Sequence, residues 1–313
     1  MMPWRRLDGG AMARDMTALS DNSRGALYMT ICMVAFTIND AFMKIVLADL
    51  PLLQALFLRG LLTSGMLLAL AIQMRALRWP QAPRDRWLIA IRTVAEVVGA
   101  LLFMTALAQM PIANLSAIMQ VMPLAVTLAS ALVFREPLGW RRLMAIAVGF
   151  GGVMLIVRPG TEGFDIYSVY ALSSVAAVTV RDLAARRLSA DVPSLSVAWI
   201  TASGVGLMGL AGVPFTEWVP MRVQDWLWLA GASVFVTYGY LLSVMAMRVG
   251  EVGFIAPFRY SSLIAALILG FLFFGEWPRA LTFLGAFIVV ATGVFTLYRE
   301  HRVLHARKRM PVP

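Results

Sequence analysis

The sequence predicts an all-α integral membrane protein with ten transmembrane helices, arranged as two inverted repeats of five helices each. Of its 313 residues, 60% are hydrophobic and only 14% are charged, whereas soluble domains average roughly 45–50% apolar and about 25% charged residues. Ten segments are mostly apolar over about the 20 residues that a helix needs to cross a bilayer. The connections between them are short, which leaves no room for a domain outside the membrane. A soluble domain and a disordered chain are both excluded.

The ten predicted spans follow one another with proline or glycine in most of the connections. In order they are 26–46, 52–73, 87–108, 111–134, 140–157, 166–185, 194–213, 226–247, 253–274 and 279–298. The predicted organisation has a cytoplasmic tail (1–25), a first five-helix repeat (26–157), a second five-helix repeat (166–298) and a basic cytoplasmic tail (299–313).

The distribution of basic residues predicts the orientation of the chain. With the N-terminus on the inside, 20 of the 27 lysines and arginines fall in inner segments and three fall in outer ones. The remaining four, which are Lys44, Arg59, Arg92 and Arg259, fall within spans. An excess of lysine and arginine marks the cytoplasmic side of a membrane protein. This bias therefore predicts an even number of spans with both termini in the cytoplasm, and it explains the net charge of +10 without a nucleic-acid partner.

A weak internal repeat relates the two halves of the chain at an offset of 140 residues. Phe134 and Glu136 align with Phe274 and Glu276, and each pair is followed by a proline and then by a span that contains glycines. Because each repeat holds an odd number of spans, the halves point in opposite directions. Inverted halves that meet in the middle of the membrane are typical of secondary transporters.

Ionisable groups inside a membrane are costly, so each one is a candidate for function. Asp40 and Lys44, and likewise Arg92 and Glu96, are spaced to pair within their own helices, and this local pairing competes with a role in binding cargo. Arg59 could reach Asp40 or an anionic group on cargo, and Arg181 could simply snorkel to the interface. The predicted cargo-binding residues are Asn39, Asp40, Arg59, Arg92, Glu96, Gln120, Tyr238, Tyr240, Arg259 and Tyr260, and the predicted proton carriers are Asp40, Glu96 and Asp182.

Two prolines predict interrupted helices beside the cargo. Pro257 removes a backbone donor from the ninth span, directly before Arg259 and Tyr260, and Pro123 occupies a similar place in the fourth span. Unpaired backbone groups persist inside a membrane only beside protein or a water-filled cavity. We therefore expect a cavity lined by spans 1, 3, 4, 6, 8 and 9.

Other classes of protein fit the sequence poorly. A membrane-embedded enzyme would need metal-binding carboxylates, a histidine base or an activated nucleophile, and the two histidines, His301 and His305, both lie in the tail. No cofactor, resident metal or ATP-binding loop is expected. A channel would need a selectivity filter, and the sequence contains no recognisable motif for one.

Several motifs resemble those of the drug/metabolite transporter superfamily, in its ten-helix branch of duplicated EamA-type units. These are the segments 134–137 and 149–153, with their second copies at 274–276 and 293–294. Segments 39–44 and 256–260, together with Arg92, are similar to a bacterial branch that includes riboflavin and S-adenosylmethionine uptake proteins. The resemblance implies a transporter of the bacterial inner membrane but does not fix its cargo.

The predicted function is alternating-access transport of a small organic metabolite. Riboflavin uptake, or uptake of a similar flat vitamin, is favoured because the chain resembles the branch that includes riboflavin uptake proteins and because aromatic and amide side chains suit a flat ligand. S-adenosylmethionine is the alternative, since its sulfonium would seek a carboxylate such as Glu96 or Asp182. Export of amino acids, metabolites or drugs stays open, as do the coupling ion and the choice between a monomer and a homodimer.

Overall fold

The computed structural model describes residues 21–135, 139–159, 165–189, 191–249 and 252–309, excepting the side chains of 247, 248, 252, 253 and 300–309. Most of the predicted N-terminal tail, the Glu136–Pro137 pair and the side chains of His301 and His305 lie outside this description.

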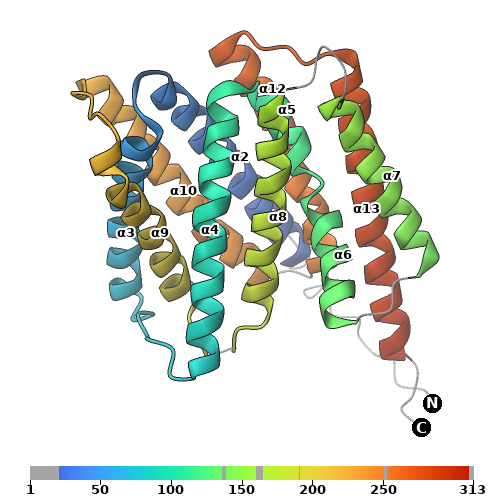
Figure 1. The fold of residues 1–313 in the computed structure, drawn as a ribbon. Helices are drawn as coiled ribbons and strands as arrows, with labels where there is room; N and C mark the ends of the chain where they lie inside the picture. The colour runs from blue at the N-terminus through green and yellow to red at the C-terminus, as the bar shows by residue number, and fades with distance from the viewer. Residues whose placement is uncertain (1–20, 136–138, 160–164, 190, 250–251, 310–313) are drawn as a thin grey trace, which may run out of the picture.

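All regular elements in the described part of the chain are helices, and they stand side by side in one bundle (Figure 1). They are α2 (Asp21–Asp49), α3 (Leu52–Gln73), α4 (Pro83–Gln109), α5 (Ile112–Met119), α6 (Met122–Phe134), α7 (Trp140–Val157), α8 (Ile166–Arg186), α9 (Ser194–Ala211), η1 (Val213–Phe215), α10 (Val223–Val249), α11 (Val252–Ile255), η2 (Ala256–Tyr260), α12 (Ser261–Phe274) and α13 (Ala280–Arg309). Several of these helices run further than the apolar segments predicted. α2 begins within the expected tail, and α13 continues into the basic C-terminal segment.

Nine helical segments of the described chain are long and apolar enough to cross a membrane. α8 is not among them, because its polar face and its three charged residues, Arg181, Asp182 and Arg186, lower its hydropathy. It nevertheless packs along α4 within the bundle (Figure 1). The outer surface carries exposed large apolar side chains such as Trp87, Leu132 and Phe287. A surface of this kind suits contact with lipid rather than water, so the protein is a multi-pass membrane protein.

Local sequence explains where the helices start and stop. Pro83 opens α4, at a position where its missing N–H is not needed. The Asp165 carboxylate accepts a hydrogen bond of 3.0 Å from the Tyr167 amide and so caps α8. Gly275 ends α12 in the left-handed conformation (φ 63°), which glycine adopts without steric cost.

Two of the membrane-crossing segments contain an interruption, one near the middle of its segment and one near the start. α5 stops at Met119 and α6 begins at Met122, just before Pro123. In the second half, the 3-10 turn η2 contains Pro257 and separates α11 from α12. Proline lacks the N–H that would continue the helical ladder, which accounts for both interruptions.

Helix boundaries recur at a spacing of 140 residues. α4 and α10 begin at Pro83 and Val223, and α6 and α12 end at Phe134 and Phe274. The residue after each of these ends, Arg135 or Gly275, has a positive φ. The two halves therefore share their pattern of elements and not only a few identical residues.

The helices pack as pairs, and each pair joins one half of the chain to the other. The main pairs are α2 with α10, α3 with α9, α4 with α8, and α7 with α13, while α12 lies against α5. Glycine allows two of these pairs to approach closely. A Cβ atom placed on Gly60 would lie 2.5 Å from the Cα of Gly206, and one placed on Gly152 would lie 2.9 Å from the carbonyl oxygen of Gly285. Such approaches are typical of small residues between membrane helices.

Candidate functional site

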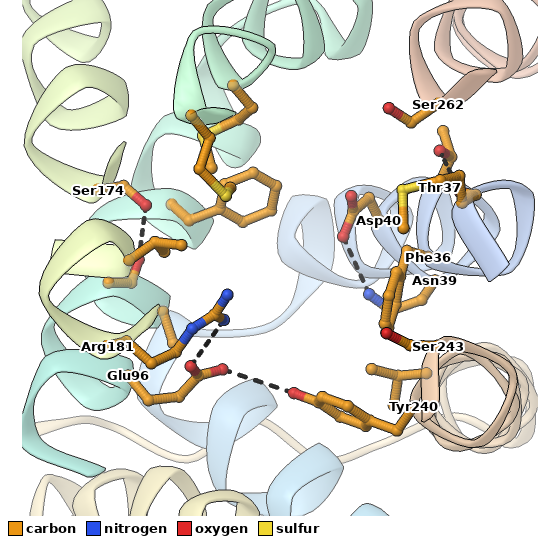
Figure 2. Close-up of a pocket in the computed structure, with 18 of the residues that line it drawn as sticks. Phe36, Thr37, Asn39, Asp40, Glu96, Ser174, Arg181, Tyr240, Ser243 and Ser262 are labelled. Atoms are coloured by element: carbon orange, nitrogen blue, oxygen red, sulfur yellow. Dashed lines mark hydrogen bonds and ion pairs between the residues drawn. The ribbon is translucent and has the colours of Figure 1, made fainter. Parts of the chain in front are cut away.

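A cavity of about 480 Å³ lies inside the bundle. In Figure 2, side chains from the α4–α8 pair, such as Glu96 and Arg181, face side chains from the α2–α10 pair, such as Asp40 and Tyr240. α5, α6 and α12 also contribute, together with α3 and α9. The expected lining of six spans is thus extended by two helices: α3, from which only Arg59 was predicted to bind cargo, and α9, from which no residue was predicted. The volume falls in the range of small-molecule sites, roughly 300–1,000 Å³.

The cavity holds an ion-paired cluster centred on Glu96. Arg181 Nη1 lies 2.8 Å from Glu96 Oε2, and Arg181 Nε lies 2.9 Å from Asp182 Oδ1. The Tyr240 hydroxyl donates a long hydrogen bond of 3.5 Å to Glu96 Oε1 across the cavity (Figure 2). The predicted local pair of Arg92 with Glu96 is therefore replaced by a pair between α4 and α8. Arg181 belongs to this cluster and does not simply snorkel to the interface.

Three further arginines line the cavity with few partners. Arg59 Nη1 donates to Asn39 Oδ1 at 3.4 Å, and Arg92 Nη1 donates to Thr201 Oγ1 at the same distance. Arg92 Nε is buried without a hydrogen-bond partner. The guanidinium of Arg259, on the 3-10 turn, has neither a hydrogen bond nor an ion pair among the described residues, although the backbone carbonyl of Arg259 accepts a hydrogen bond of 3.1 Å from Ser262 Oγ. Guanidinium groups are strong donors, so these three groups leave hydrogen-bonding capacity for a ligand.

Asp40 and Lys44 do not form the predicted pair. Asp40 Oδ1 accepts a hydrogen bond of 3.0 Å from Asn39 Nδ2 and faces the cavity (Figure 2). Lys44 points elsewhere, and its Nζ lies 2.5 Å from Glu276 Oε1 and donates a 2.6 Å hydrogen bond to the carbonyl oxygen of Met110. Lys44 thus ties α2 to the segment after α12, and Asp40 is left with Asn39.

The two helix interruptions meet at the cavity wall. Gln120 Nε2, at the break between α5 and α6, donates a hydrogen bond of 2.8 Å to Ser262 Oγ, just after η2. Pro123 lines the cavity as well. Pro257 is not among the lining residues, and its part in the site is to shape the turn that carries Arg259.

Two predicted cargo-binding tyrosines lie outside the cavity lining. Tyr238 is 58% exposed on the outer side of α10. Tyr260 is buried with its hydroxyl unpaired, and it packs against Gly293. Sequence reasoning also missed several lining residues, including Phe103, Ser174 and Ser243. These residues are ordinary components of a membrane helix, and only their position relative to the other helices distinguishes them.

The carboxylates do not form a metal centre. Within the described ranges, no group of three or more His, Cys, Asp or Glu side chains is placed to hold a metal ion. The chemistry that this arrangement offers is binding, through guanidinium, carboxylate, hydroxyl and amide groups set among aromatic and aliphatic walls.

Comparisons with solved structures and curated proteins agree with this description. One crystal structure matches with a TM-score of 0.63 at 18% identity, covering 89% of this chain and 98% of its own, which is a likeness of fold. A riboflavin transporter from Vibrio cholerae is 30% identical over 208 residues, which are 66% of this chain and 69% of the relative. An S-adenosylmethionine uptake transporter from Rickettsia prowazekii is 21% identical over 93% of this chain and 98% of its own length. A pseudopaline exporter from Pseudomonas aeruginosa is 27% identical over 85% of this chain and 93% of its own.

The model of the EamA-like transporter family matches residues 23–158 and again residues 166–298. The two matches together cover most of the chain. The resemblance to the drug/metabolite transporter superfamily, read from the Phe-x-Glu and glycine motifs, is confirmed. This chain belongs to the EamA-like transporter family.

Proposed function

We propose that this protein is a secondary transporter that takes up riboflavin, or a similar flat metabolite, across the bacterial inner membrane by alternating access. The observation that carries the proposal is the position of the cavity, with its charged groups, between the α2–α10 and α4–α8 pairs. A site between two movable helix pairs can open to either side when they rock.

The helix pairing supports two inverted halves, with α8 as the tenth span. Numbering the spans from one to ten, with α5–α6 and α11–α12 counted once each, gives the pairs 1–8, 2–7, 3–6, 4–9 and 5–10. Exchanging every span with the one five places away leaves this set of pairs unchanged, as a two-fold axis between the halves requires. The pairs 1–8 and 3–6 are exchanged with each other, and the cavity lies between them.

The carboxylates suggest where a coupling proton would bind. Glu96 and Asp182 both lie within 3 Å of Arg181, so both are committed to the ion-paired cluster. Among the described residues, Asp40 accepts a hydrogen bond only from Asn39. We therefore place the proton on Asp40. This arrangement also ranks S-adenosylmethionine below riboflavin, because the carboxylates expected to meet its sulfonium are already paired.

The proposal is tested in a bacterial riboflavin auxotroph grown on limiting vitamin. We expect the wild-type chain to restore growth, while uptake of labelled S-adenosylmethionine, measured alongside, stays at background. We expect Arg92→Ala and Arg259→Ala to abolish rescue while the protein remains in the membrane, because each removes a donor from the cavity wall. Arg84→Ala, an exposed arginine on α4 outside the cavity, is the matched control.

Failure of the wild-type chain to restore growth at normal expression would reject riboflavin as cargo. Full rescue by both cavity variants would show that these arginines do not contact cargo.

A further inference from the structure

The arginines of the cavity are unevenly provided with anionic partners. Four arginines (Arg59, Arg92, Arg181 and Arg259) and three carboxylates (Asp40, Glu96 and Asp182) line it. Arg181 alone takes two of the carboxylates, at 2.8 Å and 2.9 Å. The other three guanidinium groups share one remaining carboxylate, which lies within ion-pairing distance of none of them in the described structure. The site therefore has an excess of unneutralised guanidinium groups.

Arg59 and Arg92 act on the same part of the cavity. Both interact electrostatically with the Glu96 carboxylate, whose hydrogen bonds come from Arg181 and Tyr240. Each guanidinium has five N–H donors, yet each has a single hydrogen bond of 3.4 Å to protein. The buried Nε of Arg92 and the buried hydroxyl of Thr63, one turn beyond Arg59, have no partner. Unsatisfied donors at the wall of a cavity are the groups that a ligand would complete.

The same region offers a surface for an aromatic ring. The rings of Phe36 and Tyr240 lie edge to face with their centroids 5.6 Å apart, and both residues line the cavity together with Phe103. The Tyr240 hydroxyl lies 3.5 Å from Glu96 Oε1 (Figure 2), and Glu96 interacts electrostatically with Arg59 and Arg92, so the aromatic wall adjoins the wall that carries these two arginines. A ring lying on the first wall would carry a substituent into reach of the second.

We infer that the site favours organic anions: a flat aromatic molecule whose carboxylate or phosphate is held by Arg59 and Arg92 binds more tightly than a neutral molecule with the same ring. This inference rests on the proposed function and extends its substrate class from neutral riboflavin to anionic molecules of similar shape. Arginine is suited to this task because its planar fork binds carboxylate and phosphate oxygens in pairs. A cationic cargo is disfavoured, since it would face Arg59, Arg92 and Arg259 with no free carboxylate except Asp40.

The test uses two pairs of probes that differ in charge but share a ring. The first pair is riboflavin and riboflavin 5′-phosphate, whose phosphate carries about −1.5 to −2 at neutral pH. The second pair is indole-3-acetamide and indole-3-acetate. Dissociation constants are measured on the purified full-length protein in detergent. We expect the anion of at least one pair to bind roughly tenfold tighter or more than its neutral partner, the size expected for hydrogen bonds to a charged group.

The preference must depend on the two arginines. We expect Arg59→Gln and Arg92→Gln each to reduce the preference for the anion, and the double variant to remove it, while Arg84→Gln leaves it unchanged. If the glutamine variants fail to fold, the comparison of the probe pairs on the wild-type protein decides alone. The inference is overturned if the neutral members bind as tightly as the anions, if neither pair binds, or if the preference survives in the double variant.

The two proposals fail in different ways. Uptake of riboflavin without any preference for anions would leave the proposed function standing and remove the anionic class. A strong preference for anions in a protein that does not rescue the riboflavin auxotroph would support the anionic class and reject riboflavin as cargo.

Discussion

At the scale of single residues, Arg181 and Glu96 show how the ionisable groups of this membrane protein are kept inside the bundle. Their side chains are 23% and 16% exposed, and they approach to 2.8 Å from different helices. Removing one partner of a buried ion pair leaves an uncompensated charge, at a cost of about 3–5 kcal/mol when the pair is fully buried. Partial exposure and the neighbouring Arg92 and Arg59 reduce that cost.

We expect Arg181→Met to destabilise the protein by about 1–3 kcal/mol, below the range for a fully buried pair, because Glu96 loses its nearest cation. Adding Glu96→Gln to this variant should restore part of the loss, since the stranded charge is then removed. Thermal unfolding in detergent measures both effects. A single variant as stable as the wild type, or a double variant no better than the single one, would contradict this account.

The sequence was a good guide to which charged residues line the cavity and a poor guide to their partners. Charged groups within apolar segments are conspicuous, so Asp40, Arg59, Arg92, Glu96 and Arg259 could be selected directly. The predicted pairs within one helix were wrong because packing brings in stronger partners from far along the chain. Glu96 meets Arg181 from 85 residues away, and Lys44 meets Glu276 from 232 residues away. Ion pairs between residues so far apart along the chain cannot be predicted from local sequence spacing.

At the scale of elements, the close approach of α3 and α9 is set by a pair of glycines. A methyl group on Gly60 would lie 2.5 Å from Gly206 Cα and 2.7 Å from its amide nitrogen, and a backbone cannot move aside as a flexible side chain can. Gly65 lies on the same helix and is exposed, with nothing within 4 Å of an added Cβ atom. The two positions form a matched pair.

We expect Gly60→Ala to lower stability by about 1–3 kcal/mol, the usual cost of overpacking, and to impair transport because α3 and α9 are pushed apart. Gly65→Ala should be neutral or stabilising by up to roughly 1 kcal/mol, since alanine favours helix. Melting temperature in detergent and uptake in cells report the two effects. Equal behaviour of the two variants would show that the contact does not limit the packing.

The elements themselves were largely predictable, because a run of apolar residues of membrane length is a strong signal. Their interruptions could be placed from Pro123 and Pro257. α8 has a weaker apolar signal, since a helix that lines the charged part of the cavity carries serine and charged residues, yet its bounds, Ile166–Arg186, follow the predicted span 166–185 closely. The extensions of α2 and α13 beyond their apolar segments are invisible to hydropathy.

At the scale of the whole molecule, the orientation of the halves can be tested with two equivalent loops. The connection after α3 lies at the bottom of the view in Figure 1, and the connection after α9 lies at the top. They occupy the same place in the two repeats, so inverted halves require them on opposite sides of the membrane. Cys32 is buried, and Cys32→Ser provides a background without thiols.

In that background, Gln81→Cys and Glu217→Cys place one exposed thiol in each loop. We expect a membrane-impermeant maleimide added outside the inner membrane to label Glu217→Cys and to spare Gln81→Cys until the membrane is opened. This result follows from the excess of basic residues on the cytoplasmic side. Labelling of both positions from one side would refute the inverted arrangement and, with it, the proposed mechanism.

The α7–α13 pair holds the Gly152–Gly285 contact, yet within the described ranges neither helix supplies a residue to the cavity wall. The groups that stabilise this flank of the bundle are therefore distinct from the groups that line the cavity. An engineer could strengthen the protein along this flank while the recognition chemistry stays untouched, and could redesign the cavity wall without rebuilding the flank.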